Sequence, residues 1–161
     1  MPDLRGFSVM VLPVQQKTAV PSGVTADPEL AHALRSKGDG VTWVFPPELE
    51  EALQRSPGVS VRLHGLPVQV FSRAEVNRIG DPLFGNLVRL ATLTGADVAL
   101  IPVRLEYGES GAFIMSTALI DTRSGRVAWY GVLEGEPGES GDPAALASVT
   151  EALAATLFPF G

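Results

Sequence analysis

The chain has 161 residues, of which 45% are hydrophobic and 19% are charged, and its formal net charge is −6. A chain of this length buries about 70% of its unfolded surface, enough for a stable core without metals or disulfides. It contains no cysteine, which excludes disulfides, zinc–thiolate sites, iron–sulfur clusters and thiol nucleophiles. Its basic residues are scattered and outnumbered by acidic ones, so we expect no nucleic-acid partner.

The first part of the chain predicts one buried strand followed by a long connection. Residues 7–14 form an apolar run with β-branched side chains, which is typical of a strand covered on both faces. Residues 15–26 contain Pro21, Ser22 and Gly23 and show no periodicity, so we expect a polar loop. Within the ambiguous segment 59–71, residues 68–71 are expected to form a short strand.

Helices are expected at four places. Three Asp-Pro dipeptides each precede hydrophobic residues at helical spacing: Asp27-Pro28, Asp81-Pro82 and Asp142-Pro143. An aspartate carboxylate accepts free amides of a first turn and proline fits the first helical position, so each aspartate is predicted to be an N-cap. Gly38 and Gly95 stand where C-terminal caps belong. A further helix is predicted within residues 46–56, where two prolines open the segment.

The second half of the chain predicts three consecutive strands at residues 98–105, 112–120 and 126–133. A tight hairpin at residues 121–125 joins the last two strands. The last strand alternates between two faces, with Val127, Trp129, Gly131 and Leu133 on one and Ala128, Tyr130 and Val132 on the other. The order of elements predicts one α/β (α+β) domain over residues 1–161. Its single mixed β-sheet has a C-terminal antiparallel meander, and helices pack on it.

No sequence pattern for catalysis has the spacing that its chemistry requires. The Gly-Glu-Ser-Gly segments at 108–111 and 138–141 do not complete a nucleophile elbow, because Ala112 and Asp142 stand where the last glycine belongs. The acidic residues fit structural roles as caps, first-turn residues or, at Asp121, a turn residue. No phosphate-binding loop follows a strand. We therefore expect a protein that is not an enzyme, without catalytic or cofactor-binding residues and without a cofactor.

Metal binding and anion binding receive little support from the sequence. His32 and His64 are isolated and lack a metal-binding motif, so no metal site is expected. Arg78, Arg89 and Arg104 could gather around an anion, although dispersed arginines more often pair with nearby acids. A soluble small-molecule or anion binding module is accordingly the alternative to a protein-binding domain.

The sequence also predicts no direct membrane span, because no apolar run approaches the length of a membrane helix. The first five residues do not resemble a signal peptide, which combines a charged start with an apolar stretch. Synthesis without an export signal, which corresponds to a cytoplasmic location, and removal of a signal both stay open.

The order of elements resembles the small α/β domains of bacterial envelope proteins. The resemblance is carried by residues 80–90 leading to 96–103, by the first strand ending in Leu12-Pro13-Val14, and by the hairpin at 121–129. It covers nearly the whole chain. The similar domains are the amino-terminal domain of the translocation protein TolB, the penicillin-binding-protein activator lipoprotein LpoB and the periplasmic part of the curli secretion protein CsgG. This chain lacks the lipidated cysteine of the lipoprotein members.

The resemblance implies a non-catalytic, membrane-extrinsic accessory or scaffold subunit. Such a subunit docks on protein subunits of a larger membrane or envelope complex, in secretion, cell-wall synthesis or bioenergetic and photosynthetic membranes. The resemblance also favours a location on the periplasmic side of a bacterial membrane. No ligand residues of these families carry over to this chain, because the resemblance implies protein surfaces rather than a pocket.

Docking is expected on irregular segments that the core does not need. Residues 15–26 and 134–141 meet this description, and Trp43 adds a possible aromatic anchor. The expected protein-binding residues are Gln15, Lys17, Val20, Pro21, Val24, Trp43, Glu134, Glu136 and Glu139.

Overall fold

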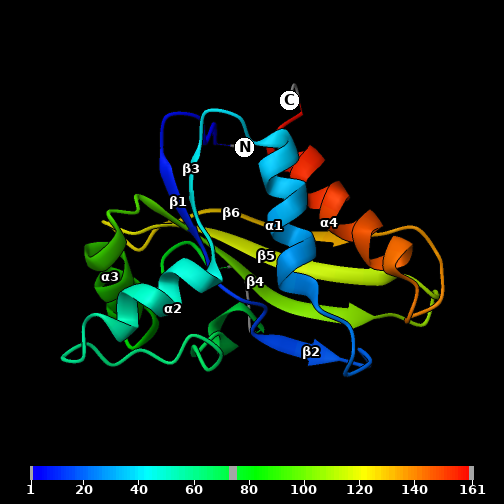
Figure 1. The fold of residues 1–161 in the computed structure, drawn as a ribbon, viewed down its shortest axis with the longest axis horizontal. Coiled ribbons are helices and arrows are strands. Elements are labelled where there is room, and N and C mark those ends of the chain that lie inside the picture. The colour runs from blue at the N-terminus through cyan, green and yellow to red at the C-terminus, as the bar shows by residue number, and fades with distance from the viewer. Residues whose placement is uncertain (1, 73–75, 160–161) are drawn as a thin grey trace.

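The computed structural model describes residues 2–72 and 76–159, and within them it contains one mixed sheet of six strands (Figure 1). The strands are β1 (Ser8–Val11), β2 (Gln16–Thr18), β3 (Thr42–Val44), β4 (Val98–Tyr107), β5 (Phe113–Asp121) and β6 (Val127–Glu134). The helices are α1 (Ala26–Lys37), α2 (Pro46–Gln54), α3 (Leu83–Thr94) and α4 (Pro143–Leu157), with a short 3-10 helix at Gln69–Ser72.

The sheet has the strand order β3-β1-β4-β5-β6, and β2 also pairs with β4. Pairing is parallel between β1 and both of its neighbours and between β2 and β4. It is antiparallel from β4 through β5 to β6. The predicted α/β class, the mixed sheet and the C-terminal antiparallel meander are confirmed.

Alternate side chains of β1 and the residue that follows it separate two hydrophobic cores. Val9 and Val11 lie in the first core, together with apolar residues of α1 and α4. Met10 and Leu12 lie in the second core, together with apolar residues of α2 and α3. The helices α1 and α4 lie side by side on one face of the sheet (Figure 1), and α2 and α3 pack on the opposite face. The central strands are therefore covered on both faces, as their continuous apolar sequence predicts.

The three Asp-Pro dipeptides do not all act as predicted. Asp142 is the N-cap of α4, and its carboxylate accepts the Ala144 amide at 3.0 Å. At α3 the N-cap position is Pro82, although the Asp81 carboxylate still accepts the Gly85 amide at 2.8 Å.

The prediction for Asp27 is wrong, because the N-cap of α1 is Thr25. The Asp27 carboxylate instead accepts the Val14 amide, at 3.0 Å, just beyond β1. A long-range hydrogen bond thus replaces the expected local one.

Three short elements also differ from the sequence expectations. Residues 16–18, expected within a loop, form β2 on β4, and residues 42–44 form β3 on β1. Residues 69–72 form a 3-10 helix, so the strand predicted at 68–71 is wrong. Strands of three residues carry too few side chains for a period-two pattern, and only the neighbouring strand stabilises them.

The predicted glycine caps are both present, and each has a clear physical reason. Gly95 ends α3 with a φ of 74°, a left-handed conformation that glycine adopts without steric cost. Gly38 ends α1 where the Trp43 ring passes close by, because a Cβ on Gly38 would lie 2.6 Å from Cζ2 of that ring. The end of α1 therefore requires a residue without a side chain.

The Asp142 cap predicts a measurable loss of stability. We expect Asp142→Ala to lower the free energy of unfolding by about 0.5–2 kcal/mol, because the first turn of α4 loses its side-chain acceptor. Urea denaturation followed by circular dichroism measures this change. Asp142→Asn is the matched control, since the amide oxygen still accepts the Ala144 hydrogen. Equal denaturation midpoints for Asp142→Ala and the wild type would contradict the assignment.

Candidate protein-docking surfaces

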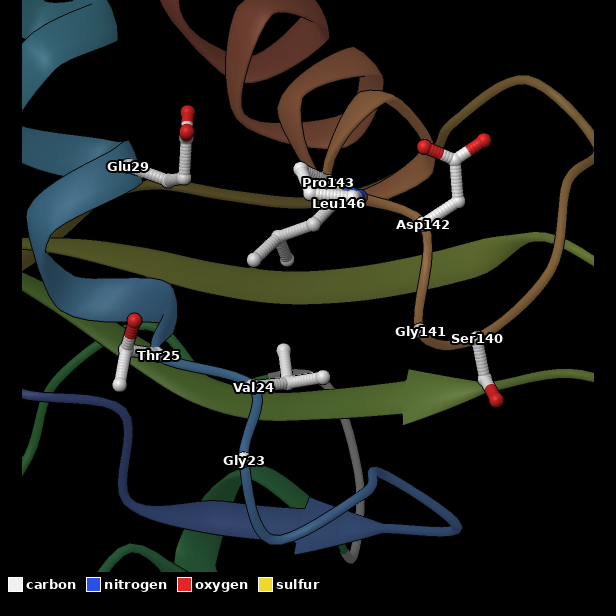
Figure 2. Close-up of a pocket in the computed structure, with 9 residues that line it drawn as sticks. All are labelled: Gly23, Val24, Thr25, Glu29, Ser140, Gly141, Asp142, Pro143 and Leu146. Atoms are coloured by element: carbon white, nitrogen blue, oxygen red, sulfur yellow. The ribbon is translucent and has the colours of Figure 1, made fainter.

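The two segments that the sequence predicts as docking loops meet at one cleft. Residues 23–25 lie on one side of it and residues 140–143 on the other, with Glu29 and Leu146 completing the lining (Figure 2). The segments come together because α1 and α4 lie side by side and begin at the same end of the sheet. The sequence predicted each segment separately, but it gave no indication that they meet.

The chemistry of this cleft suits a protein side chain better than a metabolite. Val24 and Leu146 point toward one another across its apolar floor, while the carboxylates of Glu29 and Asp142 stand at its rim (Figure 2). Its volume is about 160 Å³. Small-molecule sites usually occupy about 300–1,000 Å³. The Asp142 carboxylate is also engaged with the Ala144 amide.

The residues predicted on the first loop divide into structural and exposed members. The Gln15 side chain donates to the Pro13 carbonyl at 2.8 Å and to the Leu63 carbonyl at 2.7 Å, and it accepts the Leu66 amide at 3.0 Å. Val20 and Val24 are half-buried against the first core. Lys17, on β2, and Pro21 are exposed.

The second loop is mainly exposed, whereas Trp43 is half-buried against the first core. Glu136 and Glu139 are exposed, and the exposed Glu134 carboxylate accepts the Ser110 hydroxyl at 2.8 Å. The Trp43 ring stacks on Phe45 at 5.7 Å and meets Phe158 edge-on at 5.9 Å. Its indole N–H donates to the Gly38 carbonyl at 3.3 Å. The exposed members available to a partner are Lys17, Pro21, Glu134, Glu136 and Glu139.

A second surface, which the sequence did not single out, lies on the sheet itself. On the second-core side, Arg104, Ser116 and Val132 form one row across β4, β5 and β6, and none of them is buried. Val132 is 59% exposed and Tyr130 is 41% exposed. The strict alternation of β6 predicted two faces, but it did not show which of them the helices leave open.

A groove of about 270 Å³ lies between the N-terminal segment and the 121–125 hairpin. It contains the carboxylates of Asp3, Asp97 and Asp121, and each of them already accepts hydrogen bonds from the protein. Asp97 accepts the Ser8 amide at 3.0 Å and lies 3.7 Å from the Arg123 guanidinium. Asp121 accepts the Arg123 amide, as expected of a turn residue. The hydrogen bond from the Arg5 guanidinium lowers the pKa of Asp3 and raises the pKa of Arg5.

The arginines considered for anion binding have separate surroundings. Arg104 lies 3.2 Å from the Glu106 carboxylate, and Arg89 donates to the Asn86 side chain at 3.2 Å. Arg78 pairs through its backbone with the start of β6. The three arginines therefore have different partners and do not form one anion site.

Residues 2–72 and 76–159 contain neither a candidate metal site nor a candidate membrane-spanning helix. No group of three or more His, Cys, Asp or Glu side chains there could hold a metal ion. Of the histidines, His32 is exposed on α1, and His64 places Nε2 3.6 Å from Oε1 of Glu50. In the same residues, no helix combines the length and the apolar character needed to cross a bilayer.

Comparison with known proteins identifies the fold through solved structures. The LpoB C-terminal domain from Salmonella enterica matches with a TM-score of 0.54 and 19% identity, covering 81% of this chain and 83% of that chain. The fold is similar to that of the LpoB C-terminal domain. The domain from Escherichia coli gives a TM-score of 0.52 and 20% identity, covering 83% and 84% of the two chains.

A bacterial lipoprotein also has a similar fold. Lipoprotein GNA1162 from Neisseria meningitidis matches with a TM-score of 0.55 and 16% identity, and the match covers 99% of each chain. No family model matches this chain, and no curated protein sequence is significantly similar to it. The expected resemblance to LpoB is confirmed at the level of the fold, whereas those to TolB and CsgG stay predictions.

The hydrogen bonds of Gln15 predict a structural role within the LpoB-like fold. We expect Gln15→Ala to lower the free energy of unfolding by about 1–3 kcal/mol, because it leaves two carbonyls and one amide without their partner. Thermal and urea denaturation measure the loss. Gln16→Ala is the neighbouring control, expected within about 0.5 kcal/mol of the wild type because its side chain makes no hydrogen bond to the described residues. Equal effects of the two substitutions would argue against this role.

Proposed function

We propose that this protein is a non-catalytic accessory or scaffold subunit, extrinsic to the membrane, that docks on and stabilises a larger bacterial envelope complex. We also propose that residues 1–161 form a single domain and that the protein lies on the periplasmic side of the membrane. The observation that carries it is the cleft between residues 23–25 and 140–143, where two connections distant in the sequence form one exposed surface on a rigid pair of helices.

The shape and charge of this surface support a protein partner. Binding loops held by a rigid scaffold are common, because the core is then independent of the contact. Pro21 and Lys17 on one loop and Glu136 and Glu139 on the other are exposed. A partner that offers an apolar side chain to Val24 and a basic rim to the glutamates would match the cleft.

The LpoB-like fold supports the same proposal by analogy. The neighbours include a protein named as a lipoprotein and the C-terminal domains of LpoB. A shared fold does not transfer an activity, so the analogy supports only the class of function: contact with another envelope protein. The side chains of the cleft, rather than the fold, determine which partner binds.

A small-molecule or anion binding module is the weaker alternative. The larger grooves, of about 270 and 430 Å³, are lined in part by Asp97, Asp121 and Arg123, whose polar groups bind one another or the backbone. A ligand would have to break these contacts without gaining the convergent, unsatisfied polar groups that define a pocket.

The proposal predicts a charge-dependent interaction at the cleft. Affinity capture from gently solubilised native membranes should recover a defined membrane-complex subunit with the wild-type protein. We expect Glu139→Lys to reduce its recovery by about tenfold, because the change places like charge against the basic surface of the partner. Quantitative mass spectrometry of the captured proteins measures the ratio.

Glu50→Lys is the matched control, with the same charge change on α2, across the sheet from the cleft. It should capture the subunit at the wild-type yield. Recovery of the same subunit by Glu139→Lys at the wild-type yield would place the contact elsewhere. Failure of the wild type to retain any membrane-complex subunit would refute the accessory role itself.

A further inference from the structure

Strand β6 is one edge of the sheet, and most of its outer side is free of other strands among the described residues. On its inner side β6 pairs with β5. On its outer side the described residues cover only the start, where the Val127 amide donates to the Asn77 carbonyl at 2.8 Å. The Ile79 amide likewise donates to the Gly125 carbonyl at 2.8 Å. Residues 128–134 have no strand on their outer side among the described residues, and we name them the free edge.

The backbone groups of the free edge alternate in direction. The Gly135 amide donates to the Phe113 carbonyl of β5 at 2.9 Å. In an antiparallel ladder every second residue bonds to the same neighbour, so the backbone groups of Leu133 and Gly131 also point toward β5. Those of Tyr130 and Val132 point away from it. An edge with outward amides and carbonyls is a template for another strand.

From Trp129 onward, the free edge lacks the features that usually prevent pairing. Edge strands of monomeric proteins are commonly short, bulged, or interrupted by lysine or proline. Residues 128–134 contain neither residue, and their only charge is Glu134 at the end. The register shift between β5 and β6 leaves Ala128, the first residue of the free edge, without a partner on β5, whereas residues 129–134 pair with β5 in regular register. The exposed side chains of Tyr130 and Val132 add apolar surface beside the unpaired backbone.

Charges at the two ends of the free edge identify its occupant. Arg78 and Arg126, both exposed, stand together at its start. Glu134 and Glu136, both exposed, stand at its end. An identical edge in antiparallel orientation brings the basic end of each copy to the acidic end of the other, whereas a parallel arrangement would place like charges together. The pattern is therefore self-complementary about a two-fold axis.

We propose that a second copy of this chain pairs with the free edge, β6 against β6 in antiparallel orientation, about a two-fold axis at Gly131. Residues 128–134 are symmetric about Gly131, so this register uses the whole free edge. Tyr130 then faces Val132 of the second copy, an aromatic–β-branched pair that stabilises antiparallel strands. Beyond the paired strands, Arg126 faces Glu136 of the second copy. The dimer continues the sheet across both copies.

The oligomeric state of the purified chain tests this proposal. Sedimentation velocity over a concentration series should show a monomer–dimer equilibrium for the wild type. Val132→Lys should weaken the dimer by about tenfold or more, because a lysine in each copy replaces an apolar cross-strand contact and is a common block to edge pairing. Val88→Lys is the matched control, at a 38% exposed valine on α3, and should dimerise like the wild type. Circular dichroism verifies that each variant is folded.

A charge exchange tests the orientation of the two strands. Arg126→Glu and Glu136→Arg should each weaken the dimer by roughly threefold to thirtyfold, since two symmetry-related pairs become repulsive. The double variant should regain wild-type affinity. A wild type that stays monomeric at every concentration overturns the proposal, and so does a dimer that Val132→Lys leaves intact. A double variant no stronger than the single variants overturns the antiparallel register. None of these results depends on a membrane partner, so they test the dimer independently of the proposed function.

Discussion

Parallel pairing of β1 with β4 is the constraint on which the rest of the structure depends. Val9 lies opposite Val98, Met10 opposite Ala99 and Val11 opposite Leu100. These strands must be covered on both faces here, because all six of the paired residues are hydrophobic. The four helices therefore divide into α1 with α4 on the first core and α2 with α3 on the second. The connection from β1 to α1 and the connection from β6 to α4 then converge at one end, which creates the cleft.

The same constraint leaves part of the protein uncovered. The helices of the second core pack near β1 and the start of β4, so the row of Arg104, Ser116 and Val132 lies beyond them. On the first-core face, the Trp129 ring passes over Gly131, where a Cβ would lie 2.2 Å from the ring. This contact allows an edge strand with a central glycine to stay packed on one side while its other side faces solvent. The cleft and the exposed part of the sheet thus result from how the helices cover the core.

Long elements with a clear period were predictable from the sequence, and short or long-range ones were not. The alternation of Trp129 and Tyr130 correctly separated the faces of β6, and Asp142 was correctly predicted as a cap. Asp27 was assigned wrongly because its hydrogen-bond partner, Val14, belongs to another element. For the candidate site, the sequence indicated both loops. Their meeting at Val24 and Leu146 depends on the packing of α1 against α4, which no local pattern encodes.

The proposed function requires that this chain act through protein contacts at the cleft rather than through chemistry in a pocket. Photocrosslinking in living cells tests it most directly, with a photoreactive amino acid placed in turn at Pro21, Glu139 and Glu50. All three positions are exposed, so the substitutions leave the core intact. We expect a crosslink to the same envelope protein from Pro21 and Glu139 and none from Glu50. Equal crosslinking from all three positions would contradict this proposal, and so would no crosslinking from Pro21 and Glu139, which lie beside the cleft, in cells where the protein is functional.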